Sequence, residues 1–108
     1  MAYKIGIIGG TGREGSGLGY RWALAGHEVL IGSRSAEKAL KAVEDLLPKF
    51  EDKPVRLSGM TNEEAVRNCD IAVLTVPFSA HKPTLEGLKE ELQGKILIDV
   101  CVPLVPPK

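Results

Sequence analysis

The sequence has few of the residues that mark a metalloprotein, a disulfide-bonded secreted domain or a membrane protein. It contains two cysteines, Cys69 and Cys101, which form no C-x-x-C pair and have no histidine cluster nearby, so no metal site is expected. Isolated thiols of this kind are typical of buried free cysteines in a reducing cytoplasm, which is the expected compartment.

The chain has no apolar run of the ~18 residues that cross a bilayer. No signal peptide is recognised before the first apolar run. We therefore expect no membrane partner.

An excess of either charge is also absent. The 14 Lys and Arg residues balance the 14 Asp and Glu residues, giving a formal net charge of zero. A neutral chain does not predict a nucleic-acid partner, because such proteins usually carry a basic face. The 108 residues are 44% hydrophobic and 26% charged, which is ordinary for a globular protein. We expect one small domain over residues 1–108, with no linker and no second domain.

The sequence does contain a cluster of glycines directly after an apolar run at residues 4–8. Gly10, Gly12 and Gly15 fit the pattern G-x-G-x-x-G, and a helix is predicted to follow as far as about Ala25. The first glycine would form the turn, the second would let the backbone approach a pyrophosphate, and the third would let the helix pack against the strand. The N–H groups at the start of that helix would face the phosphates. The pattern predicts dinucleotide binding, and the alternative is a glycine-rich turn without a ligand.

Strand-like and helix-like segments alternate along the rest of the chain. Further strands are predicted at 27–31, 55–57, 70–76 and 95–100, and further helices at 36–47, 62–68 and 83–94. This alternation predicts an α/β fold, a Rossmann-like doubly wound parallel sheet between two layers of helices, with three αβα layers in a single domain.

Residue spacing also predicts which side chains the helices bury. Residues Leu18, Trp22 and Ala25 would form the apolar stripe of the first helix, and Ala36, Leu40, Val43 and Leu47 that of the second. Pro48 is expected to end the second helix, before a charged loop at 49–54. Ser35 is a candidate N-cap, and Thr61 with Glu64 fits a capping box. His27 is expected to be a solvated loop histidine.

The residues after the second predicted strand favour NADP over NAD. An NAD site usually has an Asp or Glu about 20 residues beyond the glycines, where it binds the ribose 2′-OH. Here the chain reads Ser33-Arg34, with Lys38 about one helical turn later. A hydroxyl donor, a planar guanidinium and an ammonium suit a 2′-phosphate, which a carboxylate would repel. Arg34 can also stack on the adenine. The alternative is a capped turn followed by ordinary surface charge.

The segment after the fourth predicted strand is the candidate wall of the nicotinamide site. Val76, Pro77 and Phe78 would provide a dry surface, which suits hydride transfer, although Pro77 can equally be explained as a strand end. His81 and Asp99 are the nearest acid–base candidates, and both also fit structural roles. The sequence contains no Ser-His-Asp set and no pair of catalytic carboxylates, so we assign no catalytic residue.

Several motifs together resemble the NADPH-dependent reductases of the deazaflavin coenzyme F420. They are Ile7-Ile8-Gly9-Gly10-Thr11-Gly12, Gly26-His27-Glu28, Gly32-Ser33-Arg34 with Lys38, Cys69-Asp70-Ile71-Ala72-Val73-Leu74-Thr75-Val76-Pro77, and the region Val102-Pro103-Leu104.

The resemblance implies an oxidoreductase that transfers a hydride between NADPH and F420. It places the phosphates of NADP(H) on a loop formed by Gly10, Thr11, Gly12, Arg13 and Glu14. It places the 2′-phosphate on Ser33, Arg34 and Lys38, and the nicotinamide near Val76, Pro77 and Phe78. Glu14 departs from the usual loop and is expected to point away from the phosphates or to pair with Arg13.

The family's members are about twice as long as this chain, and their C-terminal half completes the F420 pocket and builds the dimer. The expected partners are therefore small-molecule cofactors, with a homodimer or a missing C-terminal half as a further possibility. Two alternatives stay open: a reductase of another substrate such as an imine or β-hydroxyacid, and an NADP(H)-sensing module without catalysis.

Overall fold

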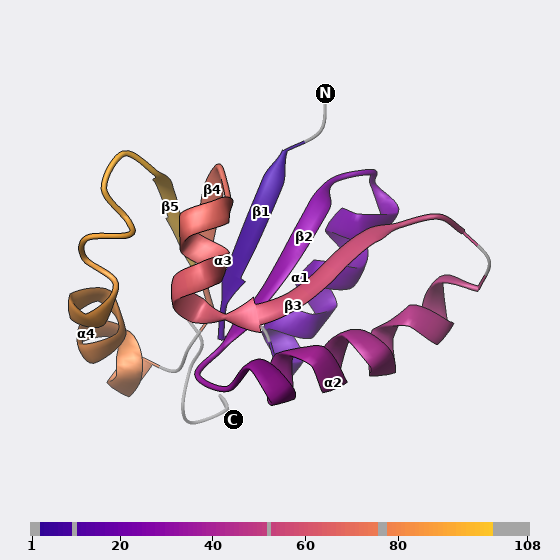
Figure 1. Cartoon of the computed structure of the whole chain (residues 1–108), viewed down its shortest axis with the longest axis horizontal. Helices are drawn as coiled ribbons and strands as arrows, with labels where there is room; N and C mark the ends of the chain where they lie inside the picture. The colour runs from indigo at the N-terminus through magenta and orange to yellow at the C-terminus, as the bar shows by residue number, and fades with distance from the viewer. Residues whose placement is uncertain (1–2, 10, 52, 76–77, 101–108) are drawn as a thin grey trace, which may run out of the picture.

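The computed structural model describes residues 3–9, 11–51, 53–75 and 78–100. Along this part of the chain strands alternate with helices (Figure 1). The elements are β1 (Lys4–Ile8), α1 (Arg13–Leu24), β2 (Glu28–Ser33), α2 (Ala36–Leu46), the 3₁₀ turn η1 (Leu47–Phe50), β3 (Arg56–Thr61), α3 (Asn62–Asn68), β4 (Ile71–Leu74), α4 (Phe78–Gly87) and β5 (Ile96–Asp99). The predicted order of strands and helices is confirmed, while several boundaries move by a few residues.

The strands form one parallel sheet in the order β3-β2-β1-β4-β5. In the middle of the sheet, Ile7 of β1 lies opposite Ile31 of β2 on one side and Val73 of β4 on the other. These strands are apolar runs because both of their faces are buried. The fold is the predicted Rossmann-like α/β fold. The chain leaves β1 toward β2 but returns to the other side of β1 with β4, so the strand order reverses between β1 and β4. Ligands of such sheets bind in the crevice at that point.

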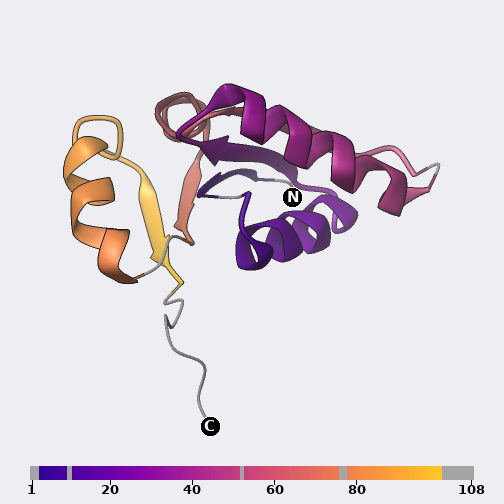
Figure 2. The same ribbon diagram turned by 90° about the horizontal axis from the view of Figure 1, so that it is seen from below.

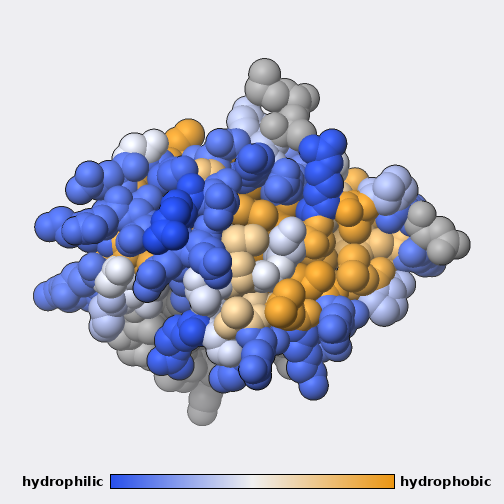
Figure 3. All heavy atoms as spheres, in the orientation of Figure 1, coloured by the Kyte–Doolittle hydropathy of each residue, from blue (hydrophilic) through white to orange (hydrophobic). Residues whose placement is uncertain are grey.

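Helices pack on both faces of the sheet and create two cores. One core joins α1 and α2 to β1 and β2 through residues such as Ala23, Val43, Ile7 and Val29. The other joins α3, and Leu88 after α4, to the opposite face of β1, β2 and β4. In Figure 2, which looks toward the edge where the strands end, α4 and β5 lie at one side of the molecule, and α1 and α2 lie at the other. Figure 3 shows charged and polar residues over α3 and α4, and apolar residues along β3.

Helix α1 packs on the sheet mainly through small residues. Leu18 and Trp22 pack against the core as predicted, but Ala25 is exposed. Gly19 and Ala23 are buried instead, and a Cβ atom on Gly19 would lie 3.0 Å from Cδ1 of Ile31. The hydrophobic spacing missed this close approach because glycine adds nothing to an apolar pattern.

Helix α2 buries a different stripe from the predicted one. Its buried residues are Ala39, Val43 and Leu46, whereas Leu40 is 52% exposed and Leu47 is 43% exposed. Gly59 of β3 explains the rotation: a Cβ atom there would lie 2.6 Å from the carbonyl group of Ala39, so the helix backbone rests directly on the strand.

The segment after α2 was predicted to be a charged loop, and this was wrong for its first residues. Pro48 ends the α-helix but lies within η1, where proline is tolerated near the start of a turn. Phe50 is only 2% exposed, and its ring lies 4.9 Å from that of Tyr20 between centroids. The loss of an amide donor at Pro48 therefore changes the helix type without taking the chain away from the core.

Helix α4 begins before Pro83, at Phe78, and ends at Gly87 rather than at Gly94. The predicted apolar spacing continues beyond it in turns, where the amide of Leu92 donates to the carbonyl of Leu88 at 2.9 Å. His27 lies in a loop as predicted, where it is half-buried and its Nδ1 accepts a hydrogen bond from the amide of Tyr3 at 3.1 Å. Across the described ranges, every helix is too short or too polar to traverse a bilayer.

Candidate functional site

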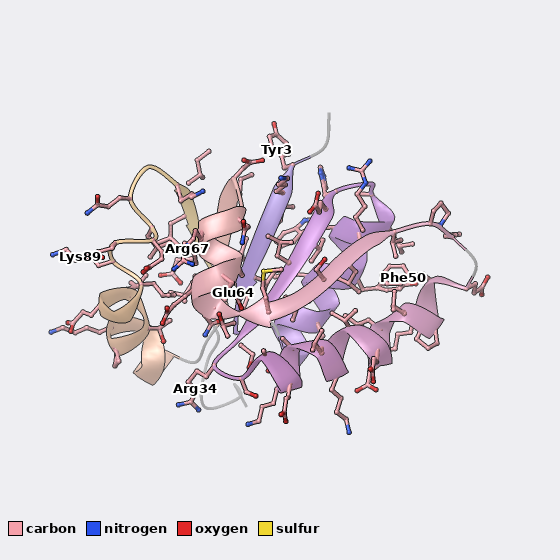
Figure 4. All side chains as sticks on the ribbon, viewed as in Figure 1. Tyr3, Arg34, Phe50, Glu64, Arg67 and Lys89 are labelled. Atoms are coloured by element: carbon pink, nitrogen blue, oxygen red, sulfur yellow. The ribbon has the colours of Figure 1, made fainter. Side chains whose placement is uncertain are left out.

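A pocket of about 890 Å³ lies at the edge where the parallel strands end. Residues from four parts of the chain line it: Gly9, Thr11, Ser33, Arg34, Ser35, Lys38, Thr61, Asn62, Glu63, Pro83, Thr84, Gly87 and Leu88. Figure 4 shows Arg34 at this edge and Tyr3 at the opposite edge of the sheet. The pocket therefore lies where an α/β sheet of this kind binds its ligand.

The glycine loop makes the turn from β1 into α1. Gly9 has φ +75°, a left-handed conformation that glycine adopts without strain, and its carbonyl accepts a hydrogen bond from Gly12 at 3.4 Å. The sequence had assigned this turn to Gly10, which lies outside the described residues. Gly12 is the N-cap of α1, and a Cβ atom there would come no closer than 3.8 Å to the Gly9 carbonyl oxygen. Packing against the described residues therefore does not require glycine at position 12, whereas close approach of a ligand to this backbone would.

Two side chains from other elements hold the glycine loop in place. The hydroxyl of Thr75, which is 6% exposed, donates to the carbonyl of Ile8 at 2.8 Å and to that of Gly9 at 3.2 Å. From the other side, Oδ1 of Asn62 accepts a hydrogen bond from the amide of Gly9 at 3.1 Å. Sequence reasoning missed both roles, because the contacts span 53 to 67 residues of chain.

Ser33, Arg34 and Lys38 all line the same pocket, and their binding of a 2′-phosphate stays a prediction. Ser33 is the last residue of β2 and is 6% exposed, while Arg34 and Lys38 are exposed. The Ser33 oxygen accepts a hydrogen bond from the amide of Ser35 at 3.3 Å, a bond that does not use the hydroxyl proton. Ser35 is the N-cap residue of α2 by position, but its side chain makes no capping bond.

The junction between β3 and α3 supplies the third side of the pocket. The predicted capping box is present: the amide of Glu64 donates to the Thr61 hydroxyl at 3.3 Å, and the amide of Thr61 donates to the Glu64 carboxylate at 3.2 Å. This cap fixes the start of α3 and with it Asn62 and Glu63, which line the pocket. Glu63 is a carboxylate that the sequence did not assign to the site.

Part of the predicted site is described only as backbone or not at all. Arg13 and Glu14 form the first turn of α1, and Phe78 begins α4. Gly10, Val76 and Pro77 lie outside the described residues. The roles of these six residues in binding phosphates and nicotinamide stay predictions.

Cys69 is a buried free thiol, as predicted, and Cys101 lies outside the described residues. Cys69 is 1% exposed and donates to the carbonyl of Val66 at 3.3 Å. Burial raises the pKa of its thiol above the ordinary value of 9.0. Cys69 therefore stays protonated near neutral pH and is unsuited to act as a nucleophile. Within the described ranges, no group of three or more His, Cys, Asp or Glu residues is placed to hold a metal ion.

Comparison with known proteins links this chain to one family. The family model for "NADP oxidoreductase coenzyme F420-dependent" matches residues 4–103. The F420-dependent NADP reductase of Methanothermobacter marburgensis is 48% identical over 101 residues, which cover 94% of this chain and 45% of that protein. The F420-dependent NADP reductase of Methanocaldococcus jannaschii is 37% identical over 103 residues, which cover 94% of this chain and 46% of that protein. The chain thus spans about half the length of the curated relatives it matches.

Solved structures share the fold. The crystal structure of a putative F420-dependent NADP-reductase from Arthrobacter sp. FB24 matches with a TM-score of 0.76 and 24% identity, covering 93% of this chain and 46% of that one. The (S)-3-hydroxybutyryl-CoA dehydrogenase of Ralstonia eutropha matches with a TM-score of 0.72 and 18% identity, covering 92% of this chain and 41% of that one. At these identities the likeness is evidence of a shared fold alone.

Proposed function

The chain belongs to the family of coenzyme F420-dependent NADP oxidoreductases, and we propose that it forms the NADP(H)-binding half of an enzyme that transfers a hydride between NADPH and F420. We assign residues 1–108 to one dinucleotide-binding domain. The family supports the class of reaction, and the pocket supports the binding of the nucleotide.

One observation carries the assignment of NADP(H): a single pocket brings Thr11 of the glycine loop together with Ser33, Arg34 and Lys38. A dinucleotide phosphorylated on its adenosine ribose has two anionic groups, the pyrophosphate and the 2′-phosphate. The loop and the N-terminus of α1 would bind the first through backbone N–H groups. The hydroxyl of Ser33, the guanidinium of Arg34 and the ammonium of Lys38 would bind the second. A pocket of about 890 Å³ falls in the usual range for cofactor sites.

Glu63 is the one carboxylate on the described lining, and it opposes the two cations there. It would weaken the attraction of the pocket for any anion, so specificity for the 2′-phosphate depends on direct contact with Arg34 and Lys38 rather than on a general positive field. We place Gly10, Arg13 and Glu14 along the pyrophosphate, with backbone groups as the main contacts.

For the reaction itself, we propose that Val76, Pro77 and Phe78 form the wall of the nicotinamide site. F420 would accept or give the hydride as the other substrate, and the accompanying proton would be exchanged with solvent on the F420 side of the site, away from the dry wall around the nicotinamide. This chain then contributes binding and orientation of the dinucleotide and exclusion of water, which requires no catalytic acid or base from the described pocket.

The F420 side of the site would come from further polypeptide, because the curated relatives are about twice as long. Strand β5 is the surface we propose for that contact. Its residues Ile96, Leu97 and Ile98 are 62%, 40% and 45% exposed, which is unusual for consecutive apolar residues in a parallel sheet. A second copy of the chain on this edge would be the alternative. We expect the protein to work in the cytoplasm, where a thiol such as Cys69 stays unpaired.

The first experiment is a titration of the chain with NADPH, NADP and NAD at one fixed ionic strength, for the wild type and for Arg34→Ala. The wild type should prefer NADP(H), and the variant should lose about 10- to 100-fold in affinity for NADPH while its affinity for NAD changes less than about threefold. The reason is that the guanidinium would make its charge-assisted hydrogen bonds to the 2′-phosphate, which NAD lacks, while any stacking on the adenine would be weaker and common to both nucleotides.

Arg56→Ala is the matched control, since Arg56 is an exposed arginine on β3 that does not line the pocket. Equal losses for NADPH and NAD in Arg34→Ala would contradict the assignment of the 2′-phosphate. F420 reduction, followed by absorbance with and without the C-terminal half of a relative, then separates a reductase of F420 from a reductase of another substrate and from a sensing module.

A further inference from the structure

Asn62 connects two parts of the pocket that are far apart in the sequence. It is the first residue of α3, next to the capping box, and its Oδ1 accepts the amide hydrogen of Gly9 at 3.1 Å. Gly9 is the left-handed residue of the glycine turn. The direction in which the chain leaves β1 is therefore set partly by a side chain that directly follows β3, a strand that pairs with β2 and not with β1.

Gly32 makes this contact possible. A Cβ atom on Gly32 would lie 2.8 Å from Oδ1 of Asn62, and also 3.1 Å from the carbonyl oxygen of Ile7 and 3.1 Å from Cβ of Ala65. The amide of Asn62 thus passes directly over the backbone of β2, in space that only glycine leaves open. Gly32 also directly precedes Ser33 and Arg34, two of the residues proposed to bind the 2′-phosphate.

We infer that Asn62 and Gly32 together position the glycine loop for the pyrophosphate of the dinucleotide. This inference rests on the proposed function and adds to it two residues that act through Gly9. Asn62 holds the turn so that the following backbone N–H groups face the pocket before the ligand arrives. Because the loop is fixed in advance, less conformational freedom is lost when the phosphates bind.

Oδ1 is occupied by Gly9, so the amide group of Asn62 has a fixed orientation, in which Nδ2 is its donor atom. That nitrogen belongs to a residue on the pocket lining. The main effect we assign to Asn62 is to hold the glycine loop in place. Affinity for a ligand with a pyrophosphate should therefore depend on Asn62, whereas affinity for adenosine 2′-monophosphate, which has none, should not.

The test uses the full chain with two readouts, for Asn62→Ala and Gly32→Ala. The first is hydrogen exchange of the Gly9 amide without ligand, which should become at least about tenfold faster in both variants because its acceptor is removed or displaced. The second is a pair of titrations with NADPH and with adenosine 2′-monophosphate, which has no pyrophosphate. Affinity for NADPH should fall about tenfold, the equivalent of one hydrogen bond of usual strength, and affinity for the monophosphate should change less than twofold.

Asn68→Ala is the matched control for lost helix stability. Asn68 is the last residue of the same helix, where its Nδ2 donates to the carbonyl of Glu64 at 2.8 Å, and it is not on the pocket lining. Its substitution should lower the stability of the fold while leaving Gly9 exchange and the affinity for NADPH within twofold of the wild type. Gly32→Ala keeps the Asn62 side chain, so it tests the inference even where Asn62→Ala does not fold.

The outcomes distinguish this inference from the proposed function. If wild-type protein binds NADPH and Asn62→Ala binds it equally well, the inference is wrong and the proposed function stands. Equal losses for NADPH and the monophosphate would also overturn it, since Asn62 would then act on the adenosine side and not through the loop. A wild-type chain that binds neither ligand would overturn the proposed function and the inference with it.

Discussion

Among single residues, Cys69 shows how burial decides the chemistry of a side chain. Its thiol is 1% exposed and donates to the carbonyl of Val66, and Nζ of Lys95 lies nearby, donating to the Cys69 carbonyl oxygen at 2.6 Å. The positive charge of Lys95 favours a thiolate, but burial has the larger effect, and the pKa of the thiol is raised. The ammonium of Lys95 instead holds the C-terminal end of α3, where it also donates to the carbonyl of Arg67 at 3.4 Å.

The raised pKa of Cys69 predicts how stability depends on pH. A folded-state pKa above the unfolded value of about 9.0 means that the folded chain retains a proton which the unfolded chain loses. The stabilisation is complete below pH 9.0 and decreases as the pH rises toward and through the folded pKa. Urea unfolding from pH 7.5 to 10.5 should therefore show the wild type losing stability relative to Cys69→Val above pH 9.0. A difference that stays constant over this range would contradict the raised pKa.

At the scale of elements, two glycines in regular structure are predicted to respond to alanine with opposite signs. Gly59 lies in β3, where a Cβ atom would come within 2.6 Å of the backbone carbonyl of Ala39. Backbone atoms, unlike the end of a flexible side chain, cannot rotate out of the way, so α2 would have to move away from the sheet. Gly59→Ala should therefore destabilise the fold by about 2–3 kcal/mol. Gly17 lies within α1 on its exposed side, and apart from its own helix backbone and chain neighbours no described atom lies within 4 Å of an added Cβ. Gly17→Ala should stabilise the fold by about 1 kcal/mol.

Urea denaturation of both variants at pH 7 measures these changes, and NADPH titration checks that Gly17→Ala leaves binding within twofold of the wild type. A destabilising Gly17→Ala would contradict the helical geometry of α1 at that position. A neutral Gly59→Ala would contradict the direct packing of α2 on β3.

The elements also show what the sequence can and cannot predict. Continuous apolar runs at β1 and β4 and the capping box of α3 are local signals, and the sequence predicted these elements and their order. The rotation of α2 depends on Gly59, and the burial of Phe50 depends on Tyr20, so neither follows from spacing within one segment. In the site, the glycine pattern and the Ser33-Arg34 pair were visible locally. Asn62 was not, because its role exists only once β1, β2 and α3 are side by side.

At the scale of the whole molecule, the two edges of the sheet differ. Strand β3 is covered on one face by α2, whereas every residue of β5 is exposed. Strand β5 is the last strand of the sheet, and Figures 1 and 2 show it beside α4, on the side of the molecule away from α2. Neighbouring apolar residues on an exposed edge strand promote pairing with another chain. The curated relatives, which are about twice as long, have additional polypeptide that could cover this edge.

We therefore predict that the 108-residue chain associates with itself through β5, and that Ile96→Lys prevents this. Ile96 is 62% exposed, so the substitution removes little buried surface and should change the free energy of unfolding by less than about 0.5 kcal/mol. Sedimentation velocity over a range of concentrations should show association of the wild type and a monomer for the variant.

Leu47→Lys is the control, since Leu47 is a 43% exposed apolar residue on the α2 side of the molecule. It should associate like the wild type. Adding the C-terminal half of a relative should compete with self-association in the wild type but have no effect on Ile96→Lys, because both partners would use the same exposed strand. Equal association of the wild type and Ile96→Lys would show that β5 is not the contact surface.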